Sequence, residues 1–139
     1  MILLIEDNLD DVDLTMRAFK KNNIKAEVVV LDDGQKAIDY LKEMNNKVKI
    51  PDVIFLDLKL PKKSGFDVLD YLRNEKKSIV PVVILTSSIE ESDLIRAYSY
   101  GANSYIRKPI DFLQFIDNIQ TISAYWLTLN QSSPVFIGD

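Results

Sequence analysis

The chain has 139 residues, 47% of them hydrophobic and 27% charged, with a formal net charge of -4 and with neither cysteine nor histidine. This composition favours one folded domain with one core and argues against general nucleic-acid binding, which needs a basic surface. The missing residue types exclude disulfides, thiolate or imidazole metal sites and histidine-based catalysis within the chain. No apolar run approaches the ~20 residues of a membrane span, so we expect a cytoplasmic protein.

The first half of the chain alternates apolar runs with helical patterns. Residues 2–5 are predicted as a strand that ends in acidic residues. From about 10 to 22, apolar residues recur at i, i+4 and i+7, which predicts a helix. Residues 28–31 form a second strand, Asp33-Gly34 opens a second helix, and residues 53–56 form a third strand. The expected apolar faces of the two helices are Val12, Met16 and Phe19, and Ala37, Leu41 and Met44.

The alternation continues beyond the third strand. Ser64 is suited to cap a third helix, which carries an apolar face, and residues 81–85 are predicted as a fourth strand. The spacing from Ser88 to Glu91 predicts a capping box, so a fourth helix should follow it. Gly101 suits the C-terminal cap of that helix. The apolar face of the third helix consists of Phe66, Leu69 and Leu72.

A short fifth strand is predicted over residues 104–106, and a long last helix starts at Asp111. Because the strands show no polar alternation, they are expected to be buried on both faces, as in a parallel sheet. Right-handed crossovers then cover both faces with helices, which gives a doubly wound (βα)₅ α/β fold. We assign residues 1–130 to this domain and residues 131–139 to a C-terminal extension, with no separate output domain. The apolar residues of the last helix are Phe112, Phe115, Ile116, Ile119 and Trp126.

Polar residues follow four of the five predicted strands. Glu6 and Asp7 follow the first strand, Asp57 the third, Thr86 the fourth and Lys108 the fifth. In open α/β sheets, ligands bind outside the carboxyl ends of the strands. We therefore expect three carboxylates, a hydroxyl and an ammonium to converge on one edge of the sheet.

The chemistry of this set is that of phosphoryl transfer. Three close carboxylates repel one another unless a cation neutralises them, and oxygen ligands suit Mg²⁺. A carboxylate such as Asp57 can act as the nucleophile on phosphorus, while Lys108 and Thr86 bind phosphate oxygens. Taken singly, each residue has a simpler interpretation as a helix cap, a strand-edge residue or a surface charge. Their joint placement at successive strand ends favours the functional one.

These residues resemble the receiver domain of two-component response regulators, over essentially the whole chain. The resemblance implies a flavodoxin-like fold with strand order 2-1-3-4-5. It is closest to regulators associated with bacterial-phytochrome kinases, and it implies a signalling phospho-acceptor rather than a metabolic enzyme. The matching motifs are Ile5-Glu6-Asp7-Asn8, Phe55 to Pro61 with Ser64-Gly65, Leu85-Thr86-Ser87, and Gly101-Ala102 through Tyr105 to Lys108-Pro109.

The resemblance also implies a donor and a metal. Asp57 would be phosphorylated by a phosphohistidine on a sensor histidine kinase or a phosphotransfer protein. Asp7, Asp57 and the backbone carbonyl of Lys59 would ligate Mg²⁺, for which Mn²⁺ can substitute, and Glu6 would act through water. Lys59 departs from the common family pattern beside the path of the hydrolytic water, as does Ser88, so the lifetime of the phosphorylated form stays open.

Further roles implied by the resemblance concern the switch. Thr86 and Lys108 would bind the phosphoryl group, and Thr86 would move toward it on activation. Tyr105 occupies the aromatic switch position and should turn inward, although its alternative role is to pack the sheet edge. A cis peptide bond between Lys108 and Pro109 would aim the lysine at the site.

The end of the last helix is unusually apolar. Tyr125 and Trp126, with Tyr98 in the fourth helix, are interpreted as an interface, because exposed aromatic clusters mark contact surfaces. The simpler alternative is that they only cover the sheet. We expect a homodimer through the face formed by the fourth and fifth helices, and no nucleic-acid or membrane partner.

Three other functions remain open from the sequence. The chain could be a phosphorelay intermediate or a phosphorylation-independent scaffold, although the intact five-residue set argues against the latter. A phosphatase of the haloacid dehalogenase type also uses a strand-end aspartate, but it needs a general-acid aspartate two residues later. Lys59 occupies that position here.

Overall fold

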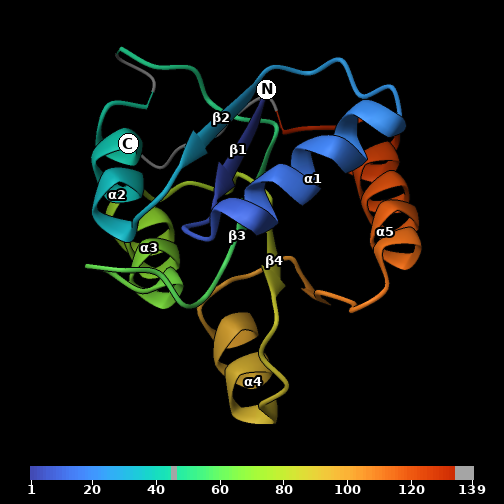
Figure 1. Cartoon of the computed structure of the whole chain (residues 1–139). Helices are drawn as coiled ribbons and strands as arrows, with labels where there is room; N and C mark the ends of the chain where they lie inside the picture. The colour runs from blue at the N-terminus through green and yellow to red at the C-terminus, as the bar shows by residue number, and fades with distance from the viewer. Residues whose placement is uncertain (45–46, 134–139) are drawn as a thin grey trace.

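The computed structural model describes residues 1–44 and 47–133. Five parallel strands form one sheet in the order β2-β1-β3-β4-β5, which confirms the predicted α/β fold and strand order (Figure 1). The predicted C-terminal extension lies outside the described residues from residue 134 onward. The strands are β1 (Ile2–Ile5), β2 (Val28–Leu31), β3 (Val53–Leu56), β4 (Val82–Thr86) and β5 (Ser104–Arg107).

Helices follow the strands in the predicted alternation. Two short π-helical segments, η1 and η2, continue the third and fifth helices without a break. No helix in the described part of the chain is long and apolar enough to cross a membrane. The helical elements are α1 (Leu9–Lys21), α2 (Gly34–Lys42), α3 (Gly65–Asp70), η1 (Tyr71–Glu75), α4 (Glu91–Ser99), α5 (Phe112–Ala124) and η2 (Tyr125–Leu129).

The sheet separates two apolar layers, because alternate side chains of each strand point to opposite faces. On one face, Leu3 and Ile54 pack with residues of α2, α3 and α4. On the other face, Leu4 and Phe55 pack with α1 and α5, where the ring of Phe19 stacks on Phe55 at 5.9 Å between centroids. Burial on both faces explains why the central strands consist of continuous apolar runs.

Most of the predicted helix starts are confirmed by side-chain caps. The Asn8 side chain accepts a hydrogen bond from the backbone N–H of Asp11 and so caps α1. Asp33 caps α2, and Ser64 forms a capping box with Asp67 at the start of α3. Asp111 caps α5.

Several predicted details are wrong. The capping box from Ser88 to Glu91 does not form, because α4 begins at Glu91 after Glu90, which makes no side-chain cap bond. The Lys108-Pro109 bond is not cis, since the described chain contains no cis peptide bond, and the trans form is intrinsically favoured. Met16 is exposed rather than part of the apolar face of α1.

Two other details concern helix ends. α4 ends at Ser99 with Tyr100 as its C-terminal cap, and Gly101 follows that cap with a φ of 101°, which glycine adopts readily. Met44 is fully buried, as expected, but it lies beyond the end of α2 and pairs with Val48 in an isolated bridge.

Candidate functional site

The carboxyl edge of the sheet brings the predicted site residues together. The strands are in register at this edge, where Ile5 pairs with Leu56 and Thr86 pairs with Arg107. Backbone bonds continue one residue further. The N–H of Asp57 donates to the Ile5 carbonyl at 3.0 Å, and that of Lys108 donates to the Thr86 carbonyl at 2.7 Å. The sheet ladder therefore fixes the backbone of each strand-end residue.

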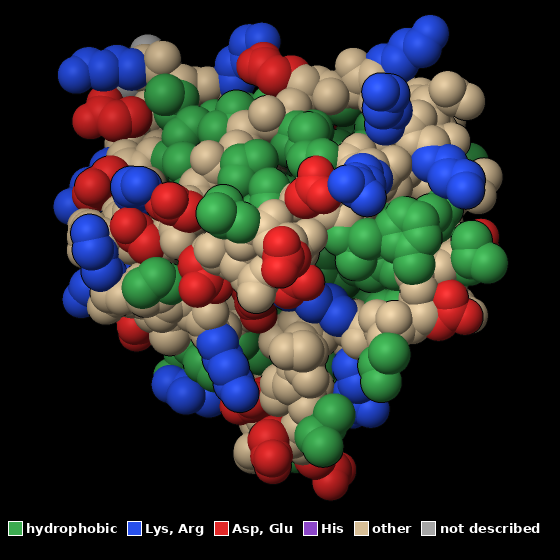
Figure 2. Space-filling model, in the orientation of Figure 1, with side chains coloured by type: hydrophobic (Ala, Val, Ile, Leu, Met, Phe, Trp, Pro, Cys, Tyr) green, Lys and Arg blue, Asp and Glu red, His purple; other side chains and the backbone are tan. Residues whose placement is uncertain are grey.

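Three carboxylates meet at this edge. Glu6, Asp7 and Asp57 each place one carboxylate oxygen within 4.8 Å of the others. Asp7 is exposed to solvent, whereas Glu6 and Asp57 are nearly buried. Figure 2 shows acidic side chains gathered around the start of α1, above α4. A set of hard oxygen donors that is open on one side fits a divalent cation that keeps some of its waters.

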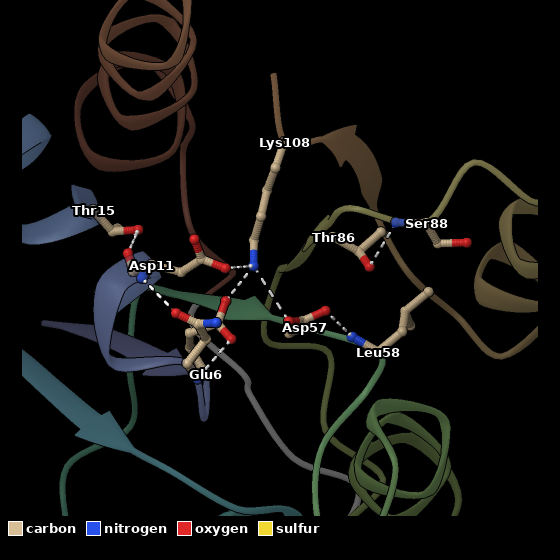
Figure 3. Close-up of polar contacts among 9 residues, drawn as sticks. Glu6, Asp11, Thr15, Asp57, Leu58, Thr86, Ser88 and Lys108 are labelled. Carbon is tan, nitrogen blue, oxygen red and sulfur yellow. Dashed lines mark hydrogen bonds and ion pairs between the residues drawn. The ribbon is translucent and has the colours of Figure 1, made fainter. Parts of the chain in front are cut away.

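Lys108 supplies the positive charge of the site. Its ammonium donates to Glu6 Oε1 in a short ion pair, to Asp11 Oδ2 at 2.9 Å and to Asp57 Oδ2 at 3.2 Å. The lysine side chain is 10% exposed, and those of Glu6 and Asp57 are 4% and 11% exposed. Figure 3 shows the ammonium at the centre of these carboxylates. The trans Lys108-Pro109 bond thus still allows the lysine to reach the site.

Electrostatics at this cluster follow from burial and charge. Burial raises the pKa of Glu6 to about 7, the ion pair with Lys108 opposes this rise, and the charge of Asp57 adds to it. For Lys108, burial favours the neutral amine, but Asp57, Glu6 and Asp11 more than offset it and raise the lysine pKa above its ordinary value. The lysine is therefore charged at neutral pH, and it is the counter-ion of the cluster.

The loop from β3 to α3 holds Asp57 in a fixed orientation. Asp57 Oδ1 accepts a hydrogen bond from the backbone N–H of Leu58 at 2.7 Å. The N–H of Gly65 donates to the Leu58 carbonyl at 2.8 Å, which folds the loop back on itself. A Cβ atom at Gly65 would lie far inside contact distance of the Asp57 carbonyl oxygen. Only glycine fits here, so Gly65 lets α3 begin directly against the acceptor residue.

Thr86 and Ser88 lie on the other side of Asp57 from Glu6 in Figure 3. Thr86 is fully buried, and its hydroxyl accepts a bond from the backbone N–H of Ser88 at 3.3 Å. Instead of capping α4, the Ser88 hydroxyl donates to Asp93 Oδ2 at 2.6 Å and accepts from the backbone N–H of Glu90. The loop that follows Thr86 is thus tied to the first turn of α4.

Tyr105 is half-buried on β5, where it packs against the core layer of α2, α3 and α4. Its hydroxyl is buried and finds no hydrogen-bond partner in the described part of the chain. The structure therefore places Tyr105 on the side of the sheet that α2, α3 and α4 cover, and its role as a switch stays a prediction. Tyr105 pairs with Ile84 in the sheet, two residues before Thr86 on β4.

Two of the three predicted interface residues, Tyr125 and Trp126, lie beside the edge strand β5. Tyr125 and Trp126 make an edge-to-face contact at 4.9 Å between ring centroids, and both line a groove of about 720 Å³ between β5 and the last helix. Tyr125 is 48% exposed, and Tyr98 on α4 is similarly exposed. The structure thus brings Tyr125 and Trp126 together, while Tyr98 stands on a separate helix outside that groove.

Asp11 was not expected in the site from the sequence. It lies in the first turn of α1, where acidic residues are common because they favour the positive end of the helix dipole. Asp7 precedes the cap of α1, so helical spacing does not relate it to Asp11, and no pattern in the sequence indicated that Asp11 reaches the site. The exposed Lys59 side chain, by contrast, takes no part in the described ion pairs of the site.

Comparison with known proteins agrees with this geometry. Residues 2–120 match the family described as the response regulator receiver domain. A probable methanogenesis regulatory protein, FilR2 of Methanothrix harundinacea, is 40% identical over 95% of this chain and 86% of its own length. Response regulator Rcp1 of Synechocystis is 36% identical over 91% of this chain and 88% of its own length.

Two solved structures show the same fold. The phosphorylated cyanobacterial phytochrome response regulator RcpA has a TM-score of 0.84 at 33% identity and covers 99% of this chain and 97% of its own. The Mn²⁺-bound form of Rcp1 has a TM-score of 0.84 at 33% identity, over 95% of this chain and 97% of that one. With the receiver match over residues 2–120 and the acidic pocket of Glu6, Asp7 and Asp57, the chain belongs to the response regulator receiver family.

Proposed function

We propose that this protein accepts a phosphoryl group on Asp57 from a phosphohistidine of a sensor histidine kinase or a phosphotransfer protein. The observation that carries the proposal is the position of the Asp57 carboxylate. It belongs to an acidic set that fits a divalent cation, and the ammonium of Lys108 lies 3.2 Å from it. A carboxylate in such a site is suited to in-line attack on phosphorus. The phosphorylated relative RcpA supports the same chemistry.

In the proposed reaction, an Asp57 oxygen attacks phosphorus as the phosphorus–nitrogen bond of the donor breaks. The electron pair of that bond leaves on the imidazole nitrogen, which takes up a proton. Mg²⁺, or Mn²⁺ in its place, held by Asp7, Asp57 and the Lys59 carbonyl and by Glu6 through water, would neutralise the charge of the attacking and transferred oxygens. Lys108 and Thr86 then donate hydrogen bonds to the phosphoryl oxygens.

Exposed apolar side chains around the site support docking of a protein donor. Leu9 begins α1, Ile110 lies in the loop before α5, and Leu113 is in the first turn of α5; all three are largely exposed. Leu9 lies on α1, whose Asp11 forms an ion pair with Lys108, and Ile110 and Leu113 follow Lys108 closely in the chain. We therefore propose that the kinase approaches over the start of α1 and of α5. A cytoplasmic location is part of this proposal.

The output is proposed to pass from the site to the edge of the sheet. Thr86 and Tyr105 sit on neighbouring strands, β4 and β5, so a movement of Thr86 toward the phosphoryl group alters the space available to Tyr105. Tyr105 also lines the groove beside Tyr125 and Trp126. We propose that this face, with Tyr98 of α4, is the regulated protein contact and forms a homodimer.

The phosphoryl-acceptor function can be tested by intact-mass measurement. The protein is incubated with Mg²⁺ and phosphoramidate, and one phosphoryl adduct is expected that is absent from Asp57→Asn and from samples with EDTA. The absence of an adduct in the unaltered protein would favour a scaffold role. Rapid multiple turnover of phosphomonoesters would instead indicate a phosphatase. Passage of the phosphoryl group to a second histidine protein would indicate a phosphorelay intermediate.

The dimer proposal has its own test. Sedimentation velocity is run with and without phosphoramidate on the unaltered protein and on Tyr125→Ser, which removes an exposed ring and leaves the site intact. We expect a phosphorylation-dependent dimer that the substitution weakens. A monomer under all conditions would refute the interface but not the acceptor function.

A further inference from the structure

Asp11 adds a fourth carboxylate to the site, and among the residues that the structure describes its side-chain carboxylate pairs with Lys108 alone. The ammonium has three N–H groups, and the three bonds to Glu6, Asp11 and Asp57 use all of them. Glu6 and Asp57 belong to the acidic set that fits the cation, but Asp11 does not. Asp11 is therefore the one bonded carboxylate of Lys108 that cation binding and phosphorylation leave available.

The backbone of Asp11 is fixed on both sides. Its N–H donates to the Asn8 side chain at 3.0 Å, and its carbonyl accepts from the Thr15 hydroxyl at 2.8 Å. Thr15 is buried, so this end of α1 is held against the core. In Figure 3, Asp11 lies on one side of the ammonium and Asp57 on the other. The carboxylate thus reaches Lys108 from a rigid helical turn.

A lysine side chain has four rotatable bonds, and ordering it costs conformational entropy. When the carboxylates of Glu6 and Asp57 turn toward a cation, the ammonium loses two of its three partners. A remaining bond from a fixed carboxylate keeps the charge beside the acceptor before the phosphoryl group arrives. Preorganised charge of this kind lowers the barrier of a reaction in which charge develops on oxygen.

We propose that Asp11 is a positioning residue, which acts through Lys108 to keep the ammonium beside Asp57 during phosphorylation. The inference rests on the proposed phosphoryl-acceptor function. Positioning and simple charge repulsion predict opposite effects of an Asp11 substitution on the rate of phosphorylation. Removing a negative charge near the site, taken alone, weakens repulsion of the anionic donor and so speeds the reaction. Loss of positioning slows it.

The kinetic test measures the rate of adduct formation with phosphoramidate as Mg²⁺ is raised to saturation. Asp11→Asn is expected to lower the maximal rate at saturating Mg²⁺ by about threefold to tenfold, as for loss of one charge-assisted hydrogen bond at a partly exposed position. Asp10→Asn is the matched control. Asp10 lies in the same turn of α1 and is exposed, so its substitution removes the same charge. Asp11→Glu, which keeps the charge on a longer side chain, should recover part of the rate.

A double-variant comparison shows whether Asp11 acts through the lysine. In a Lys108→Met background, adding Asp11→Asn should cause no further loss of rate. A second readout needs no metal. In EDTA, the urea midpoints of Asp11→Asn, Lys108→Met and the double variant are compared, and the two single shifts should not add up to the shift of the double variant, because the two side chains are coupled. Because Asp11→Glu and Asp11→Asn are compared in unaltered Lys108 protein, the test remains decisive if Lys108→Met is poorly folded.

Several outcomes would overturn the inference. They are a maximal rate for Asp11→Asn equal to or above that of Asp10→Asn, an effect confined to the Mg²⁺ concentration that gives half the maximal rate, or an equal loss in the Lys108→Met background. In each of these cases the unaltered protein still forms the adduct, so the acceptor function stands. If the unaltered protein forms no adduct, both the function and the inference fail.

Discussion

Replacing Lys108 by methionine tests the charge balance of the site most directly. The substitution keeps an unbranched chain of similar length and removes the ammonium from between Glu6, Asp11 and Asp57. Two of these carboxylates are almost buried, so solvent cannot replace the lost cation for them. We expect Lys108→Met to fold into the same structure, because the backbone of residue 108 is held by Thr86, but with lower stability.

The size of the loss follows from the burial of the partners. Removing one member of a buried ion pair costs about 3–5 kcal/mol, because a charge is left uncompensated. Two features reduce this figure. The Asp11 side chain is 37% exposed, and Glu6 can take up a proton, since its pKa is already about 7. We therefore expect a decrease of about 2–3 kcal/mol in the free energy of unfolding at pH 8, and a smaller one at pH 5.5.

The assay is urea unfolding followed by circular dichroism in EDTA, at both pH values and with equal m-values required for the comparison. Lys36→Met is the control, since Lys36 pairs with Asp32 at 2.6 Å on the exposed surface and its loss should leave the urea midpoint almost unchanged. If Lys108→Met were as stable as the unaltered protein at pH 8, or lost as much stability at pH 5.5 as at pH 8, the electrostatic reasoning would be refuted.

Three further predictions test other parts of the structure. Because the pKa of Glu6 is raised from 4.5 to about 7 in the folded protein, its contribution to stability is complete below about pH 4.5 and is lost as the pH rises through about 7. Urea unfolding in EDTA should show a fall of up to about 3 kcal/mol across this range, which Glu6→Gln flattens; an unchanged profile in Glu6→Gln would contradict the assignment. Gly65→Ala should lower stability by at least about 2 kcal/mol and slow adduct formation, because a Cβ atom there collides with the backbone of Asp57; a thermal melt equal to that of the unaltered protein would exclude this collision. Arg73→Met should lower the free energy of unfolding in urea by about 2–4 kcal/mol, since the guanidinium donates to three backbone carbonyls, including that of Gly101, and to the side chain of Asn103. The adduct on Asp57 should still form.

The architecture and the main site residues could be predicted from the sequence because their signals are local. Each central strand is a continuous apolar run, and a polar residue marks the point at which it ends. Parallel pairing then places those ends on one edge whatever the details of packing, which is why Glu6, Asp7 and Asp57 meet there. Caps such as Asp33 and Ser64 are likewise decided within one helical turn.

What the tertiary structure alone decided concerns contacts between elements far apart in the chain. The bond between Asp11 and Lys108 joins residues 97 positions apart and depends on how α1 sits beside the end of β5. Ser88 satisfies the local pattern of a capping box, but its loop is drawn toward the buried Thr86, so α4 starts later. The acidic residues at the strand ends were thus evident from the sequence. That the Lys108 ammonium also binds Asp11 depended on the packing of α1, which no local pattern specifies.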